Sequence, residues 1–140
     1  MSARAASEGP VEALDIATSN GVWVVRSSSK TVYYLDLDRG LLMRVRGAGS
    51  AVFAFDGQWV PLVGVTSRDE SPRPVHPGEI RVGERPEYLT DPDGGLADFQ
   101  WRIQRVVTAI EPVGADEAAS LGVPAPDSPR PADGDLSDFR

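Results

Sequence analysis

Residues 31–46 read TVYYLDLDRGLLMRVR, and this stretch decides the predicted fold. Apolar side chains occupy alternate positions on both sides of a central Asp-Arg-Gly. A period of two residues is typical of strands that bury one face. The same alternation extends over residues 22–66 and is interrupted by turn sequences. We therefore predict an antiparallel β-hairpin at the centre of the chain, flanked by further hairpins.

The turn of the central hairpin is predicted to be a three-residue loop, 38–40, with its glycine in the left-handed conformation. This loop pairs Leu35 with Met43 on the face expected to be buried. The same register places Tyr34 opposite Arg44 on the outer face, as a cation–π pair.

Other turn sequences divide the rest of the chain into short strands. Asp56-Gly57 favours a type I′ hairpin, and Asp91-Pro-Asp-Gly-Gly95 favours a turn. The proline-rich stretch 67–77 is predicted to be a loop. Short strands are expected at residues 79–82 and 87–89.

Residues 99–111 fit both a helical and an extended period. We prefer one long, bulged strand because Val-Val-Thr at 106–108 favours β-structure, with a helix ending before Pro112 as the alternative. Pairing this strand with the first one would remove an exposed edge. The prediction is an all-β domain over residues 21–113, a small bent antiparallel sheet or partly open barrel of about six to eight strands.

The negative charge is concentrated at the two ends of the chain. The formal net charge is −7, and residues 21–113 hold 11 basic against 12 acidic side chains. Residues 1–10 show no periodic apolar pattern, and the proline-rich acidic stretch 114–140 can bury little apolar surface, so segments 1–20 and 114–140 are predicted to be disordered. An acidic chain is a poor general binder of nucleic acid or anionic membranes, although a nearly neutral domain leaves room for a local basic face.

Composition excludes several chemical classes. The chain has no cysteine and one histidine, which excludes disulfides, thiolate metal sites, cysteine nucleophiles and multi-histidine sites. It has neither the apolar core of a signal peptide nor a run of membrane-spanning length, so a cytoplasmic protein is expected. No cofactor is predicted.

No residue pattern predicts catalysis or metal binding. Asp36 and Asp38 share a strand face but are interpreted as solvated outer residues. A calcium loop beginning at Asp91 is rejected because its twelfth position is Arg102. The Gly-Ala-Gly at 47–49 is interpreted as a connection, and His76 as an ordinary loop residue.

Two segments are candidates for binding. The predicted partner-binding face combines aromatic rings with arginines, namely Tyr34, Arg44, Arg46, Trp101 and Arg102. Such a face could also stack single-stranded nucleic acid, whereas the alternative for the aromatic residues is core packing.

The second candidate lies in the tail. Residues 133–139 repeat the pattern of residues 93–99, which is either accidental or a docking motif formed by Asp135, Leu136, Asp138 and Phe139.

The segments 23–38, 56–59 and 105–111 resemble uncharacterised small β-proteins of actinobacteria and their phages. The resemblance rests on hairpin sequences and implies no activity. The preferred hypothesis is therefore a non-enzymatic interaction domain that binds a partner, most readily a protein, with an acidic tail that modulates binding. A small-barrel nucleic-acid binder is the alternative, and an enzyme of unknown class ranks third.

Overall fold

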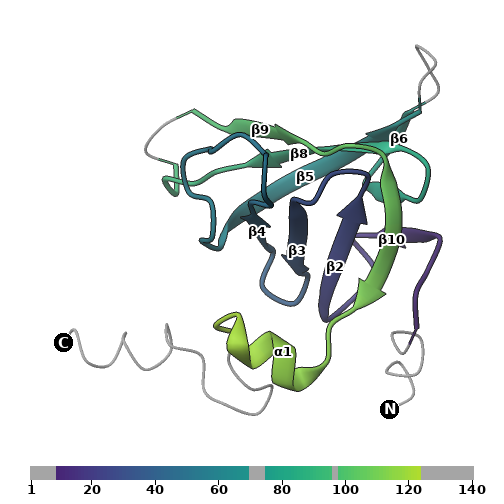
Figure 1. The fold of residues 1–140 in the computed structure, drawn as a ribbon, viewed down its shortest axis with the longest axis horizontal. Coiled ribbons are helices and arrows are strands. Elements are labelled where there is room, and N and C mark those ends of the chain that lie inside the picture. Colours follow the sequence, from purple (N-terminus) through teal and green to yellow (C-terminus); the bar gives the residue numbers. More distant parts are fainter. Residues whose placement is uncertain (1–8, 70–74, 96–97, 124–140) are drawn as a thin grey trace.

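A computed structural model describes residues 9–69, 75–95 and 98–123, and Figure 1 shows its arrangement. The predicted all-β class and antiparallel sheet are confirmed, with ten strands and one short helix in the described part of the chain. In chain order the elements are β1 (Ala13–Asp15), β2 (Val22–Ser27), β3 (Val32–Asp36), β4 (Leu41–Val45), β5 (Val60–Arg68), β6 (Val75–Pro77), β7 (Glu79–Arg81), β8 (Arg85–Thr90), β9 (Gln100–Ile103), β10 (Val107–Pro112) and α1 (Ala115–Ser120).

Eight strands form one strongly bent sheet in the order β10-β2-β3-β4-β5-β8-β9, with β6 paired to β5. Strand β5 joins the two halves, because its start pairs with β4 and its remainder with β8. An irregularity between Leu62 and Gly64 marks the place where β5 changes partners. The sheet therefore bends like a barrel, but β9 and β10 remain its two edges.

The prediction of one strand over 99–111 is only partly right, and the helical alternative is wrong. The segment forms two strands, β9 paired with β8 and β10 paired with β2, so the last strand does pair with the first of the predicted domain. Gln104 sits at the corner between them and is buried. Its side chain accepts a hydrogen bond from the Tyr88 hydroxyl at 2.7 Å and donates one to the Val25 carbonyl at 2.9 Å. These bonds hold the two halves of the sheet together at the bend.

The predicted register of the central hairpin is wrong by one residue. Strand β3 ends at Asp36, which pairs with Leu41, so the loop has four residues, and Gly40 does have a positive φ of 69°. Leu35 consequently pairs with Leu42, and Tyr34 pairs with Met43 instead of Arg44.

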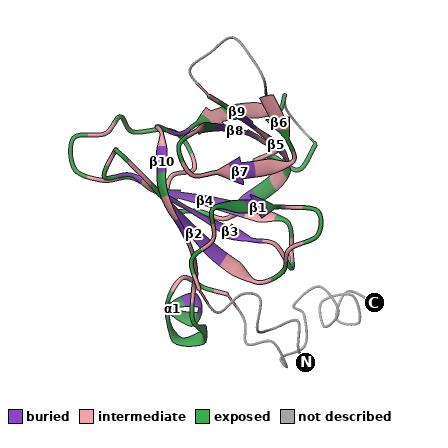
Figure 2. Cartoon of the chain, turned by 90° about the vertical axis from the view of Figure 1, so that its right-hand side faces the viewer, coloured by how far each residue is buried: buried purple, intermediate pink, exposed green. Residues whose placement is uncertain are grey.

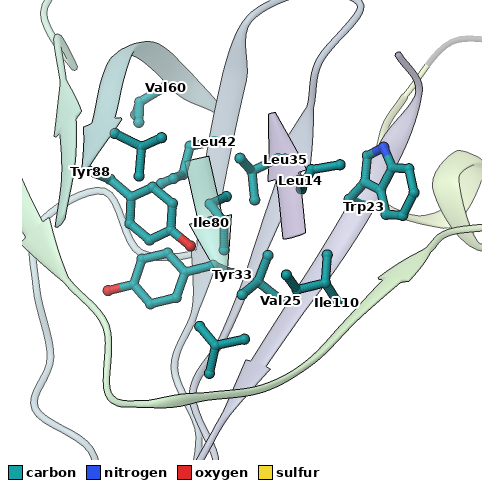
Figure 3. Packing of buried hydrophobic residues seen from close by; sticks show 12 residues of the cluster. Leu14, Trp23, Val25, Tyr33, Leu35, Leu42, Val60, Ile80, Tyr88 and Ile110 are labelled. Atoms are coloured by element: carbon teal, nitrogen blue, oxygen red, sulfur yellow. The ribbon is translucent and has the colours of Figure 1, made fainter. Parts of the chain in front are cut away.

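The inner face of the sheet holds the main core. The rings of Tyr33 of β3 and Tyr88 of β8 stack there (Figure 3), and their centroids are 4.9 Å apart. The two-stranded sheet of β1 and β7 lies over the same core and contributes Leu14 and Ile80 (Figures 2 and 3). The buried members of this cluster are Leu14, Trp23, Val25, Tyr33, Leu35, Leu42, Val60, Val65, Ile80, Tyr88, Val107 and Ile110.

A second cluster covers the outer face of β2, β3 and β4. Val24, Tyr34 and Met43 are buried there against Trp59, Val113 and Leu121. This cover explains the register error, because the prediction assumed that the hairpin has one buried and one solvated face.

The domain boundaries also differ from the prediction. Within the segment 1–20, expected to be disordered, β1 forms and Leu14 is buried, and within 114–140 helix α1 forms with Ala118 buried. Residues 1–8 and 124–140 lie outside the described residues.

Three further predictions concern the loops. The hairpin expected at Asp56-Gly57 is wrong, because these residues form a turn within a long connection between β4 and β5. The predicted short strands at 79–82 and 87–89 are confirmed as β7 and β8. The loop predicted over 67–77 is shorter than expected, since β5 extends to Arg68 and β6 begins at Val75, with residues 70–74 outside the described part.

Candidate functional site

The predicted partner-binding face does not assemble as one surface. Tyr34 is buried in the outer cluster, whereas Arg44 lies on the inner face opposite Tyr33. Trp101 and Arg102 are neighbours on β9 and therefore point to opposite faces. Arg46 is exposed in the β4–β5 connection, where it donates a hydrogen bond to the Ser50 carbonyl.

Arg44 has a structural role that the sequence did not reveal. It is 7% exposed, and its Nη1 lies 2.6 and 2.8 Å from the two carboxylate oxygens of Asp56. Its Nη2 donates to the Ala51 carbonyl at 3.1 Å, and its guanidinium lies 4.0 Å from the centroid of the Phe53 ring. Arg102 reaches the same loop by donating to the Ala54 carbonyl. The two arginines fix the loop beside the sheet.

The paired aspartates also differ from their prediction. Asp36 is 1% exposed rather than solvated, and its carboxylate accepts hydrogen bonds from the backbone and the guanidinium of Arg39. Asp38 is exposed and accepts a bond from the Gly21 amide. The Asp36 carboxylate thus stabilises the β3–β4 loop, and the Asp38 carboxylate joins that loop to the residue before β2. Within the described ranges, no group of three or more His, Cys, Asp or Glu side chains is placed to hold a metal ion.

The remaining polar candidates serve local structure. His76 lies in β6 rather than a loop, and its Nδ1 is 2.9 Å from a carboxylate oxygen of Glu84. Asp91 accepts a hydrogen bond from the Gly95 amide and so closes the predicted turn. The tail motif Asp135, Leu136, Asp138 and Phe139 lies outside the described residues.

The aromatic residues divide between core and surface. Trp23 and Tyr33 belong to the inner core, and Tyr34 and Trp59 to the outer cluster. Trp101 is the large exception, with 56% of its surface exposed. Of the two aromatic residues in the predicted face, Tyr34 is therefore core, as the core-packing alternative expects, and Trp101 is exposed.

An exposed apolar surface follows strand β9. Trp101 is joined there by Ile103, which is 53% exposed, and by Phe99, which is 51% exposed just before the strand. Trp101 pairs with Leu89 of β8, and Leu89 pairs with Gly64 of β5. Val63, which precedes Gly64 at the irregularity in β5, is 48% exposed. We call Phe99, Trp101, Ile103, Leu89 and Val63 the β9 surface. The sequence showed the alternation of Phe99, Trp101 and Ile103 but not that this face lacks a cover.

The backbone of β9 adds to this surface. Gln104 donates a backbone hydrogen bond to the Pro86 carbonyl, which sets the alternation of hydrogen-bonded pairs between β8 and β9. In an antiparallel ladder the intervening residues, Trp101 and Ile103, direct their N–H and C=O groups away from β8. Among the described residues, no further backbone group bonds to them, and only the Trp101 carbonyl accepts a side-chain bond, from Arg102 at 3.1 Å.

A pocket of about 500 Å³ opens at the end of the sheet where β2 turns into β3. Its walls come from this turn, from the β4–β5 connection and from the corner after β9. We call it the rim pocket, and its lining residues are Ser27, Ser28, Ser29, Lys30, Thr31, Tyr33, Arg44, Ala48, Gly49, Ser50, Ala51, Phe53, Ile103, Gln104 and Arg105. The sequence identified residues 27–30 only as a turn, so this pocket was not predicted.

Hydrogen bonds between side chains join the two loops at the rim. The Thr31 hydroxyl donates to Ser50 Oγ and accepts a bond from the Gly47 amide, and Ser29 Oγ lies 3.3 Å from Ser50 Oγ. Gly47 has to be a glycine, because a Cβ atom there would lie 2.4 Å from the Lys30 backbone. The rim is thus held in one arrangement by its own contacts.

Comparisons with protein-family models, curated proteins and solved structures gave no match for the chain. In the described part, no helix combines the length and apolar character needed to span a membrane. A fold alone does not determine an activity, so function has to be argued from the β9 surface and the rim pocket.

Proposed function

We propose that this chain is a non-enzymatic interaction domain of the cytoplasm that binds an extended segment of a partner protein along β9. The observation that carries the proposal is the edge position of β9, with the backbone of Trp101 and Ile103 directed outward and both side chains more than half exposed. An added strand would bond to this backbone and place its own side chains beside the exposed apolar groups.

The other edge of the sheet supports the choice of β9. At β10, Val11 donates a backbone hydrogen bond to the Ile110 carbonyl at 3.0 Å, so an N-terminal segment already lies against that edge. Proteins commonly protect an exposed edge with an inward-pointing charge. Arg102 provides such a charge at β9, and its guanidinium donates a hydrogen bond to the Trp101 carbonyl. A backbone N–H of an incoming strand would replace Arg102 as the donor to this carbonyl. The acidic residues beyond α1 are proposed to modulate the affinity for the partner.

The test uses peptides selected against the full chain from a random twelve-residue display library. We expect selected peptides to be apolar at alternate positions and to slow hydrogen exchange at the Trp101 and Ile103 amides at least about tenfold. The Arg102 amide is the internal control. It is directed toward β8 in the antiparallel ladder, so it should already exchange slowly without peptide. Protection confined to other parts of the chain would overturn the proposal.

Two variants distinguish binding at the β9 surface from nonspecific binding to any exposed apolar side chain. Trp101→Ser is expected to weaken the selected peptides by about tenfold or more, the range of an aromatic interface residue. Val52→Ser is the matched control, since Val52 is 72% exposed but lies in the β4–β5 connection. Equal losses in the two variants would contradict the assignment.

The nucleic-acid alternative is tested with the same variants. Tight binding of a single-stranded oligonucleotide that falls steeply with salt and is lost in Trp101→Ser would replace the protein-binding proposal. A chain ending at residue 123 tests the tail, and an unchanged peptide affinity would remove the modulating role from the proposal.

A further inference from the structure

The rim pocket gathers the unpaired cations of the described part of the chain. That part contains ten Lys and Arg side chains, and all but Lys30 and Arg105 make an ion pair or a hydrogen bond within it. Both of these exposed cations line the rim pocket. The lining set contains no carboxylate, and the Asp56 carboxylate that bonds to one of its members, Arg44, is engaged in that ion pair.

The hydroxyl groups at the rim have a surplus donor. Ser29, Thr31 and Ser50 carry three hydroxyl protons, and two contacts join these hydroxyls to one another. The amides of Thr31 and Gly47 also donate to this group, to Ser29 Oγ and Thr31 Oγ1. One hydroxyl proton is therefore left to point at an acceptor that the described part of the chain does not supply.

Arg44 lines the pocket with a buried guanidinium, and its Nε is covered by protein atoms rather than open to a ligand. The Arg44 side chain is more than nine-tenths buried, and its Nε has no hydrogen-bond partner among the described residues. Tyr33 stands beside it, and burial raises the pKa of this phenol above its ordinary value, against the opposing effect of Arg44. Tyr33 is therefore a neutral hydroxyl at neutral pH and adds a further polar group without adding negative charge.

We propose that the rim pocket binds a small organic phosphate monoester. Lys30 and Arg105 match the two negative charges of such a group, and the rim hydroxyls supply neutral donors to its oxygen atoms. Phe53, which is 40% exposed, and Ile103 provide apolar surface for the organic part. A volume of about 500 Å³ falls within the usual range of small-molecule sites.

The charge distribution favours a small ligand over a nucleic acid. The whole chain has a formal net charge of −7, which repels a polyanion, whereas a single phosphate group meets only its local surroundings. The neighbouring hollow, which shares Ser28, Ile103 and Arg105, contains the carboxylates of Asp69 and Glu87 and suits an anion less well. This inference does not rest on the proposed protein partner.

Phenyl phosphate is the probe, titrated into the full chain at low salt and followed by backbone amide chemical shifts. We expect saturable shifts at residues 28–31 and 50, and no saturable shifts there with phenol, which lacks the phosphate. Inorganic phosphate should shift the same amides with lower affinity, because it lacks the ring. Benzoate tests the charge requirement and should bind more weakly than phenyl phosphate.

Lys30→Gln and Arg105→Gln should each weaken phenyl phosphate about fivefold, the effect of losing one exposed charge contact. Arg26→Gln is the matched control, because it removes the same charge at an exposed position outside the pocket. The proposal is overturned if the rim amides show no saturable shift with phenyl phosphate up to about 10 mM, which is roughly the weakest dissociation constant of a useful site. Equal affinities of Lys30→Gln, Arg105→Gln and Arg26→Gln for phenyl phosphate would also overturn it. Neither result would bear on peptide binding at β9, which is tested separately.

Discussion

The two halves of the bent sheet differ in how many of their faces are covered. Around β2, β3 and β4 the inner face holds the main core, and the outer face packs against Trp59, Val113 and Leu121. In the half formed by β5, β8 and β9, the inner face holds Tyr88 and Val65, but the outer face leaves Trp101 and Ile103 in solvent.

This difference separates the stability of the domain from its binding. A strand covered on both faces gains free energy from every side chain and has nothing left for a partner. A strand covered on one face retains apolar area that is buried only when something else binds. The strongest effects of substitution on folding should therefore fall in the first half, and the strongest effects on binding in the second.

The largest contrast is expected between Leu35→Ala and Trp101→Ala. Leu35 is fully buried in β3, so its truncation leaves a cavity and should lower the free energy of unfolding by about 3 kcal/mol. Trp101 is already more than half exposed, so its truncation removes less buried area and should cost about 1 to 2 kcal/mol. Urea unfolding measures both. A loss for Trp101→Ala as large as that for Leu35→Ala would show that its face is part of the folded core.

The second prediction concerns Arg44, which holds the β4–β5 connection between the two halves. Arg44→Met leaves the Asp56 carboxylate without its ion partner in a site where its side chain is 16% exposed. We expect a loss of about 2 kcal/mol, below the usual cost for a fully buried pair because water reaches Asp56. The double variant Arg44→Met with Asp56→Asn should recover most of that loss in urea unfolding. A double variant no more stable than the single one would contradict this account.

The third prediction is a loss of stability above pH 10. Burial raises the pKa of Tyr88 well above its ordinary value of 10.0, so the folded state keeps this proton while the unfolded state releases it. Stability from Tyr88 is complete below the unfolded pKa and falls as pH rises, by up to about 1.4 kcal/mol for each pH unit until the folded pKa is reached. Tyr88→Phe should reduce this slope in urea unfolding between pH 9 and 11, while retaining the stacked ring. An unchanged slope would assign the loss to other groups.

Local patterns predicted the elements of this fold better than their pairing. Alternation in residues 31–46 identified β3 and β4, and the glycine before Leu41 has the predicted positive φ. The register failed because Met43 and Leu42 are both apolar and both buried, so the pattern contains no information about which one faces the core. The cover that decides the question comes from Trp59 and Leu121, far away in the sequence.

The candidate site was predicted only in part. Trp101 was chosen for its residue type and is exposed, but Tyr34 was chosen on the wrong register and is buried. The rim pocket could not be found from the sequence because Lys30, Ser50 and Arg105 meet only after both loops and the β9 corner have folded. Charge counts also gave no sign that Arg44 is paired and Arg105 is not, since pairing depends on distance in the structure.

The smallest expected effect tests the outer cover of the first half. Trp59 Nε1 donates to the Leu121 carbonyl at 2.8 Å, just beyond α1, and the ring packs on the cluster of Val24, Tyr34 and Met43. Trp59→Phe removes this bond and part of the ring, and should cost about 1 kcal/mol in urea unfolding. It should also speed amide exchange at Leu121 and Gly122 while leaving β9 unchanged, because no residue of β9 belongs to this cluster. Faster exchange in β9 would mean that the halves are coupled, and that the uncovered face depends on the covered one.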